Sequence, residues 1–227
     1  MPHIEEVNRI VEILKSIGVS AEWVGTDIVV MPPEEFDLEN IDTVAAGKVR
    51  SIILLTAPLA HRYDSFELPL PGGCKLGGRT MMPHIDALSK LGIHLGEGEE
   101  GMYSVDSAHR HAANIVMYES SDTAAENILM AAALVPGKTV IEFAPPNYQV
   151  QEVCFFLEKC GVRIDGIGTS TLVVHGVKEI NKPVEYYNSE DPTESMMFIS
   201  AAIVTESKLT VTRCPIDFLE LELLVHQ

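Results

Sequence analysis

The chain has 227 residues, a formal net charge of −17 and 46% hydrophobic residues. Such a length and apolar content are typical of a globular protein with one large core or two small ones. The negative charge argues against a general binder of nucleic acid or of membrane surfaces. The N-terminus lacks the basic and apolar stretches of a signal peptide, and no apolar run could span a bilayer, so we expect a cytoplasmic protein.

The first predicted element is an amphipathic helix over residues 4–18, because apolar residues recur there at helical spacing. Gly18 suits the position just after a helix end. Residues 19–23 alternate as a strand does, and residues 26–30 form a returning strand.

Two further copies of this pattern begin at His84 and Val150, and their helices end at Gly92 and Gly161. A second type of helix, followed by one strand, interleaves with them. Its helices are predicted over residues 48–59, 123–134 and 192–204, and its strands over residues 65–68, 138–142 and 208–212. The unit is therefore helix, strand, helix, strand, strand, repeated about every 70 residues.

A last helix is predicted over residues 216–227. We thus expect the chain to begin and end within a repeat unit, as a fragment or a natural short form of a longer repeat protein. The four cysteines form no CxxC pair, so we expect reduced thiols and no metal site. We expect Cys154 to pack in the core, and the run 109–111, which holds two histidines, to be an exposed strand.

A glycine-rich stretch, residues 70–80, carries Cys74 beside Lys75. Glycines let a backbone approach a ligand closely, and nearby cations lower the pKa of a thiol and raise its reactive thiolate fraction. The stretch favours acid–base or covalent chemistry on an anionic small molecule. Basic residues gather in this part of an acidic chain: Lys48, Arg50, Arg62, Lys75 and Arg79.

The spacing of the glycines in this stretch is similar to that of a phosphate-binding P-loop. Arg79 stands where that loop needs a lysine, and Pro83 follows closely, so a nucleoside triphosphatase is disfavoured.

Three segments resemble motifs of the enolpyruvyl transferases, in the same order: residues 70–79 with Cys74, the helix 123–132, and residues 157–169. The resemblance implies an α/β (α+β) fold of repeated βαβαββ units, with helices inside and sheets outside. It also implies a first domain over residues 1–184. Residues 185–227 would begin a second domain or form a final incomplete repeat.

The chain is most similar to the branch of this family that makes a peptidoglycan precursor. That branch transfers enolpyruvate from phosphoenolpyruvate to the 3′-hydroxyl of UDP-N-acetylglucosamine, through a tetrahedral ketal and without a metal or organic cofactor. The resemblance implies that Cys74 is the general acid or nucleophile, and that Arg50 and Arg79 clamp the anionic oxygens. It implies further substrate-binding residues: Thr80, Met81, Met82, Pro83, Ser121, Asp122 and Thr123.

The chain departs from the family at several positions. The lysine–asparagine pair of the family would precede Met1, and its catalytic aspartate would follow Gln227, so we expect the chain alone to be inactive. Glu119 stands where a basic residue is frequent, and Asp122 adds an acid to the phosphate-binding turn, which is unfavourable beside a pyrophosphate.

These departures leave two alternatives open. One is a non-catalytic relative that binds the UDP-sugar, and the other is an enolpyruvyl transferase with a different acceptor. A shikimate-pathway enolpyruvyl transferase is less favoured, because that relative does not rely on a loop cysteine.

Overall fold

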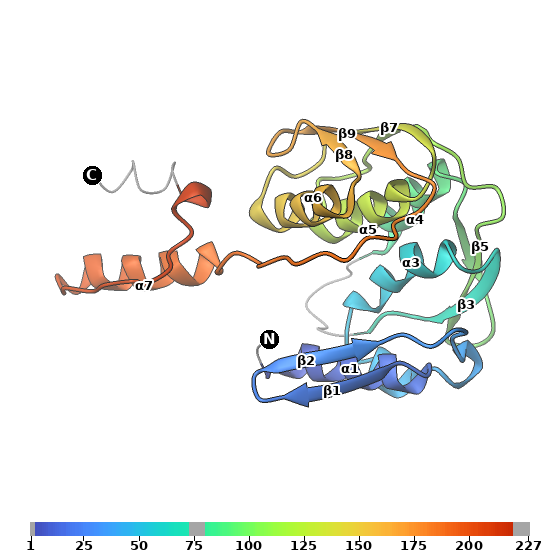
Figure 1. Cartoon of the computed structure of the whole chain (residues 1–227), viewed down its shortest axis with the longest axis horizontal. Coiled ribbons are helices and arrows are strands. Elements are labelled where there is room, and N and C mark those ends of the chain that lie inside the picture. Colours follow the sequence, from blue (N-terminus) through green and yellow to red (C-terminus); the bar gives the residue numbers. More distant parts are fainter. Residues whose placement is uncertain (1–2, 73–79, 220–227) are drawn as a thin grey trace.

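The protein is described by a computed structural model that covers residues 3–72 and 80–219. Within these residues, three sheets lie on the outside of the main body, and the helices pack against one another between them (Figure 1). The predicted α/β fold, with helices inside and sheets outside, is confirmed.

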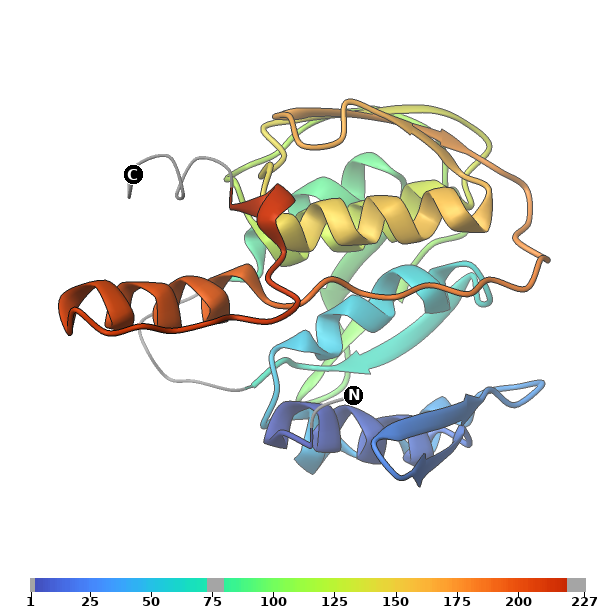
Figure 2. The ribbon, with the colours of Figure 1, turned by 60° about the vertical axis from the view of Figure 1, so that its left-hand side comes forward.

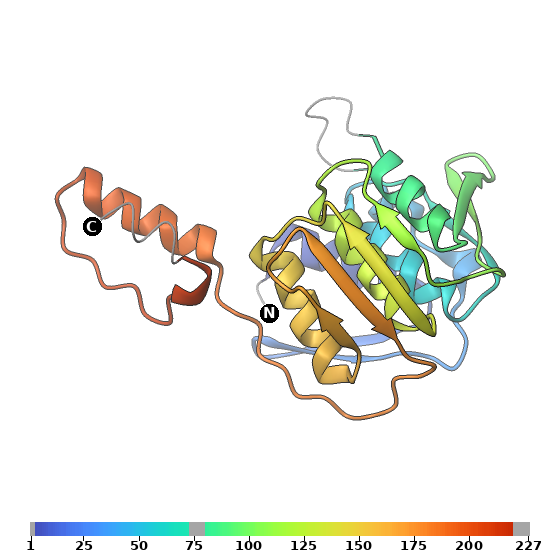
Figure 3. The ribbon, with the colours of Figure 1, turned by 90° about the horizontal axis from the view of Figure 1, so that it is seen from above.

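The region from residue 114 to residue 176 forms a complete βαβαββ unit. Its sheet has the strand order β6-β7-β9-β8, in which β6 and β7 are parallel and the other neighbours antiparallel. Figure 3 shows this sheet covering the two helices of the unit. The six elements are β6 (Asn114–Val116), α5 (Asp122–Ala133), β7 (Gly137–Glu142), α6 (Tyr148–Cys160), β8 (Arg163–Asp165) and β9 (Thr171–Gly176).

The preceding residues repeat this unit in part. Strands β3 and β4 pair antiparallel with β5, as β7 and β8 pair with β9. The elements of this second copy are η2 (Ser51–Leu55), α3 (Thr56–Ala60), β3 (Ser65–Pro69), α4 (Met82–Lys90), β4 (His94–Glu97) and β5 (Met102–Asp106). The chain before it holds α1 (Glu5–Ser16), β1 (Ser20–Val24), β2 (Asp27–Met31), η1 (Leu38–Asn40) and α2 (Thr43–Ala46).

Glycine ends the helices α1 and α6 as the sequence predicts. Gly18 has a φ of 90° and Gly161 a φ of 100°, a conformation in which a side chain would be strained. After α1, the N–H of Gly18 bonds to Lys15 and the N–H of Val19 to Leu14, at 3.1 and 3.0 Å. This pair of bonds satisfies carbonyls that the helix leaves open and turns the chain into β1.

The structure corrects the helix predicted over residues 48–59. The segment forms the 3-10 helix η2 and then the short α-helix α3. Pro58 explains the break, because a proline has no N–H to donate within a continuous helix and is tolerated in the first turn of a new one.

Three other predictions about the elements are wrong or only partly testable. Residues 208–212 form no strand, because no strand among the described residues pairs with them. The histidine-containing run 109–111 lies in the irregular connection between β5 and β6. Of the helix predicted over residues 216–227, the structure gives the 3-10 turn η3 (Ile216–Phe218); residues 220–227 lie outside the described part.

Helix α5 is the centre of the main body. It packs against α3, α4, α6 and strand β9, and most of its residues are buried. The alanines of α5 let its neighbours approach closely. Ile128 and Leu129 are fully buried, and each such side chain contributes about 1.5–3 kcal/mol to folding.

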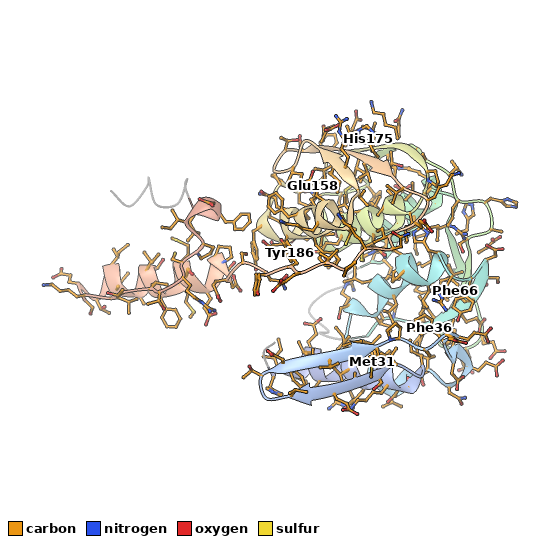
Figure 4. All side chains as sticks on the ribbon, in the orientation of Figure 1. Met31, Phe36, Phe66, Glu158, His175 and Tyr186 are labelled. Carbon is orange, nitrogen blue, oxygen red and sulfur yellow. The ribbon has the colours of Figure 1, made fainter. Side chains whose placement is uncertain are left out.

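Helix α7 (Pro192–Val204) has the bounds predicted from the sequence and stands away from the main body (Figures 1 and 2). Asp191 begins it by accepting hydrogen bonds from the N–H groups of Thr193 and Glu194, at 2.7 and 3.3 Å. Figure 4 shows its side chains projecting outward along most of its length. The predicted boundary between residues 184 and 185 falls in the extended segment that leads to α7 and stays a prediction.

No helix formed by residues 3–72 or 80–219 combines the length and the apolar character that a membrane crossing requires.

The difference between α5 and α7 predicts a difference in the response to truncation. Ile128 is 0% exposed, whereas Phe198, at the corresponding position of α7, is 45% exposed. We expect Ile128→Ala to lower the free energy of unfolding by about 2–5 kcal/mol, because it leaves a cavity in the core. Phe198→Ala is the matched control and should change it by less than about 1 kcal/mol. Urea unfolding measures both, and equal losses would contradict this description of the core.

Candidate functional site

A cavity of about 460 Å³ lies where the start of α4 meets the start of α5. Its lining comes from three stretches that are far apart in the sequence: residue 50, residues 80–84 and residues 119–123. The lining residues are Arg50, Thr80, Pro83, His84, Glu119, Ser120, Ser121, Asp122 and Thr123.

The structure therefore gathers six of the residues that the sequence analysis assigned to substrate: Arg50, Thr80, Pro83, Ser121, Asp122 and Thr123. Met81 and Met82 are not among the lining residues. Met81, which directly precedes the first turn of α4, is buried in the protein interior. Met82, the first residue of α4, projects outward with 46% of its surface exposed. Cys74 and Arg79 lie outside the described residues, as does Lys75.

Two contacts, one between backbones and one from a side chain to a backbone, involve the described residues on either side of the segment 73–79. Gly72 packs so closely against the backbone of Gly47 that a Cβ at this position would overlap the Gly47 carbonyl. Thr80 accepts a hydrogen bond through its carbonyl from Nη2 of Arg50, at 2.8 Å. Both flanks of the segment are thus tied to the stretch 47–50.

Asn127 of α5 connects the helices around the cavity and is fully buried. Its Oδ1 accepts from the N–H of Ala57 at 3.2 Å, and its Nδ2 donates to the carbonyl of Ile53 at 3.0 Å. The same Nδ2 lies 3.4 Å from Nδ1 of His84. One amide therefore uses its acceptor and both of its hydrogens to join α5 to η2, α3 and α4.

This network sets the protonation of His84. Because Oδ1 of Asn127 accepts from Ala57, the group that faces His84 is the amide nitrogen, and Nδ1 of His84 must accept. The ring hydrogen is then on Nε2, which lies 3.2 Å from Oγ1 of Thr123. Burial, and secondly the charge of Arg50, lower the pKa of His84 to about 4, so the ring is neutral at neutral pH.

The charges around the cavity are of both signs. Arg50 brings a positive charge to the lining, while Glu119 and Asp122 bring carboxylates. The first residues of α5, Asp122 and Thr123, also belong to the lining, and the N–H groups of a first turn attract anions. Burial, and then the nearby carboxylate of Asp122, raise the pKa of Glu126 one turn further along α5. A bound anion would therefore meet helix N–H groups and carboxylates together.

Two of the cysteines, Cys154 and Cys160, carry no activated thiol. Cys154 is buried in the core, as the sequence predicts, and this burial raises its pKa to about 12. Burial also raises the pKa of Cys160, while Lys182 acts in the opposite direction. Neither thiol has the lowered pKa of a reactive cysteine.

A larger cavity of about 820 Å³ lies elsewhere, between η1 and the sheet of β3 and β5. It is lined by aromatic residues, among them Phe36 and Phe66, and by carboxylates (Figure 4). None of the residues predicted to bind substrate lines it. Among residues 3–72 and 80–219, no three His, Cys, Asp or Glu side chains form a group that could hold a metal ion.

Sequence reasoning missed the role of Asn127 at this site. The residue lies within the helix motif that carries the family resemblance, but its hydrogen bonds reach residues that are 43 to 74 positions away in the sequence. A polar residue on an otherwise apolar face of a helix is the signal that could have found it, because a buried amide needs partners.

A profile of the family described as "EPSP synthase (3-phosphoshikimate 1-carboxyvinyltransferase)" matches residues 1–226. UDP-N-acetylglucosamine 1-carboxyvinyltransferase of Campylobacter hominis is 31% identical over 213 residues, which are 93% of this chain and 50% of that protein. The protein of the same name from Hydrogenovibrio crunogenus is 33% identical over 220 residues, with 93% and 50% covered. The chain thus spans about half the length of these curated relatives.

Solved structures agree on the fold. The enolpyruvyl transferase NikO from Streptomyces tendae superposes with a TM-score of 0.72 at 20% identity, over 88% of this chain and 47% of that one. An EPSP synthase from Acinetobacter baumannii superposes with a TM-score of 0.54 at 16% identity, over 79% and 41% of the two chains.

The buried neutral ring of His84 predicts how stability depends on pH. Its folded pKa of about 4 lies below the usual unfolded value of about 6.5, so the unfolded chain binds more protons between these values. The contribution of the neutral His84 ring to the free energy of unfolding is fully present above about pH 6.5 and is lost as the pH falls towards 4. Over the whole range it is about 3 kcal/mol.

The measurement is the free energy of unfolding at several pH values for the wild type and for His84→Gln. The pKa of His61 is also lowered by burial, and both proteins keep that residue. The variant should lose stability less steeply on acidification. Equal slopes in the two proteins would show that His84 does not titrate in this way.

Proposed function

Because this chain belongs to the EPSP synthase (3-phosphoshikimate 1-carboxyvinyltransferase) family, we propose that the whole protein transfers enolpyruvate from phosphoenolpyruvate to UDP-N-acetylglucosamine. The observation that carries the proposal is the gathering of Arg50, Thr80 and residues 121–123 around one cavity. The names of the relatives at about 30% identity support the choice of substrates. The proposal includes that the protein acts in the cytoplasm and serves peptidoglycan synthesis.

The proposed reaction has two steps. The 3′-hydroxyl of the sugar loses its proton to a general base of the whole protein, and its oxygen adds to the central carbon of phosphoenolpyruvate. The thiol of Cys74 gives its proton to the methylene carbon, which becomes a methyl group. The resulting ketal then loses phosphate, the Cys74 thiolate takes a proton back from that methyl group, and the vinyl ether forms. As a nucleophile, Cys74 would instead form an adduct with phosphoenolpyruvate.

Arg50 suits the anionic half of this reaction. A guanidinium can hold the carboxylate or phosphate of phosphoenolpyruvate through paired hydrogen bonds. Its bond to the carbonyl of Thr80 orients the side chain beside the cavity. Cys74 stands six residues before Thr80 in the sequence, and Arg79 immediately before it, so both are candidates for the same substrate.

A second candidate function is favoured by the carboxylates of Glu119 and Asp122, which line the end of the cavity near α5. They would repel a diphosphate. An acceptor other than UDP-N-acetylglucosamine, or a relative that binds the UDP-sugar without catalysis, would fit this feature.

The proposed reaction predicts that Cys74 is essential. We expect Cys74→Ala to lower phosphate release by the whole protein at least about 100-fold, because a general acid contributes about 10²–10⁴-fold. The assay follows phosphate from phosphoenolpyruvate and UDP-N-acetylglucosamine together. Cys160→Ala is the matched control, because this partly buried thiol lies on α6, outside the cavity, and should keep the wild-type rate. Survival of that rate in Cys74→Ala would overturn the assigned role.

A labelling experiment separates the two candidates. Fosfomycin, an epoxide that mimics phosphoenolpyruvate, should alkylate Cys74, and UDP-N-acetylglucosamine should accelerate this reaction; intact-protein mass spectrometry follows the adduct. A non-catalytic relative, or one with another acceptor, predicts no acceleration. The chain of 227 residues without further segments should release no phosphate from the two substrates.

A further inference from the structure

His84 belongs to the wall of the cavity but is almost wholly buried, and its ring is bonded to the more exposed Thr123. The residue is 2% exposed, and its Nε2 lies 3.2 Å from the hydroxyl oxygen of Thr123, which lines the cavity and is itself exposed. On the other side of the ring, Nδ1 lies 3.4 Å from the amide nitrogen of Asn127. Every polar atom of the ring therefore has a partner.

The direction of these bonds decides what Thr123 can offer to a ligand. The amide of Asn127 fixes Nδ1 of His84 as an acceptor, so Nε2–H donates to Oγ1 of Thr123. A hydroxyl that accepts from its neighbour keeps its own hydrogen for another partner. Among residues 3–72 and 80–219, His84 is the side chain bonded to this hydroxyl, and the hydroxyl hydrogen can turn to the cavity.

We infer that His84 is a positioning residue that acts on the substrate through Thr123, whose hydroxyl donates its hydrogen to a phosphate oxygen of the nucleoside diphosphate sugar. This inference rests on the proposed function and adds the means by which that site holds its acceptor. A phosphate oxygen has no hydrogen to give, so the bond forms only if the hydroxyl donates. The chain from Asn127 through His84 to Thr123 secures that direction.

The carboxylates beside Thr123 make this donor important. Glu119 and Asp122 line the same cavity as Thr123, and their charges oppose the attraction that Arg50 exerts on an anion. The uncharged donors of the lining are the hydroxyls of Ser120, Ser121 and Thr123 and the first N–H groups of α5, and among these hydroxyls that of Thr123 is the one bonded to His84. A neutral hydroxyl aimed at the anion adds affinity without changing the net charge of the site.

A double-mutant cycle tests the inference on the whole protein. Calorimetry measures the dissociation constants of UDP-N-acetylglucosamine and of uridine, which has no phosphate. Thr123→Val keeps the shape of the side chain but removes the donor, and His84→Met removes the bond that orients it. Each should weaken UDP-N-acetylglucosamine about tenfold, equivalent to about 1.4 kcal/mol, and leave uridine within about twofold.

Because His84 acts through Thr123, the double variant should also lose about tenfold rather than a hundredfold. Thr123→Ser, which keeps the hydroxyl, should restore most of the affinity. Thr193→Val is the matched control, because Thr193 has the corresponding position at the start of α7, and it should bind as the wild type does. Nitrogen-15 NMR of the His84 ring should show the hydrogen on Nε2.

Four results would overturn the inference: additive losses, equal weakening of uridine, unchanged affinity in Thr123→Val, or a hydrogen on Nδ1 of His84. If His84→Met does not fold, the Thr123 variants and the NMR spectrum still decide. If the wild-type whole protein binds no UDP-N-acetylglucosamine, both this inference and the proposed acceptor are overturned. If it binds this ligand, but no more tightly than Thr123→Val does, the inference alone is overturned.

Discussion

A single buried amide, that of Asn127, determines how the helices of the main body meet. Its acceptor and its two hydrogens are all used, on Ala57, Ile53 and His84. Burying an amide without partners is costly, so the arrangement is stable only when η2, α3, α4 and α5 are in place together. The cavity lies directly beside this junction, and its shape depends on the same bonds.

The repeat explains why the cavity lies there. Each unit places one helix centrally and the next beside it, beneath an outer sheet. The starts of α4 and α5 belong to neighbouring units, and they converge where Arg50 precedes η2. Residues far apart in the sequence are thereby brought to one place.

Electrostatics distinguish this cavity from a simple anion site. Arg50 and the first turn of α5 favour an anion, whereas Glu119 and Asp122 oppose one. In such surroundings, the direction of individual hydrogen bonds matters more than total charge. A neutral buried histidine suits this task, because its ring holds a fixed donor and a fixed acceptor and adds no charge of its own.

Much of the fold could be predicted from the sequence, because its signals are local. Helical spacing and a glycine stop located α1 and α6, and the bounds of α7 were predicted without error. The failures have two causes. Pro58 divides a segment whose apolar pattern is continuous, and the strand expected at 208–212 needs a partner that a local pattern cannot supply.

The site was predictable in part. Motifs shared with the enolpyruvyl transferases pointed to Arg50, Thr80, Pro83 and residues 121–123, which meet at the cavity. The same motifs included Met81 and Met82, whose side chains point elsewhere, because neighbours in the sequence face different sides at the start of a helix. The Asn127 network was not predictable, since its bonds join segments brought together by the fold.

The most direct measurement is the free energy of unfolding of Asn127→Leu, a variant of similar volume that has no amide. The variant leaves the Ala57 N–H and Nδ1 of His84 without their present partner, and each such buried group costs about 1–3 kcal/mol. The account predicts a loss of more than about 2 kcal/mol, with weaker binding of UDP-N-acetylglucosamine in the fraction that stays folded. Unchanged stability and unchanged binding would contradict the central role of this amide.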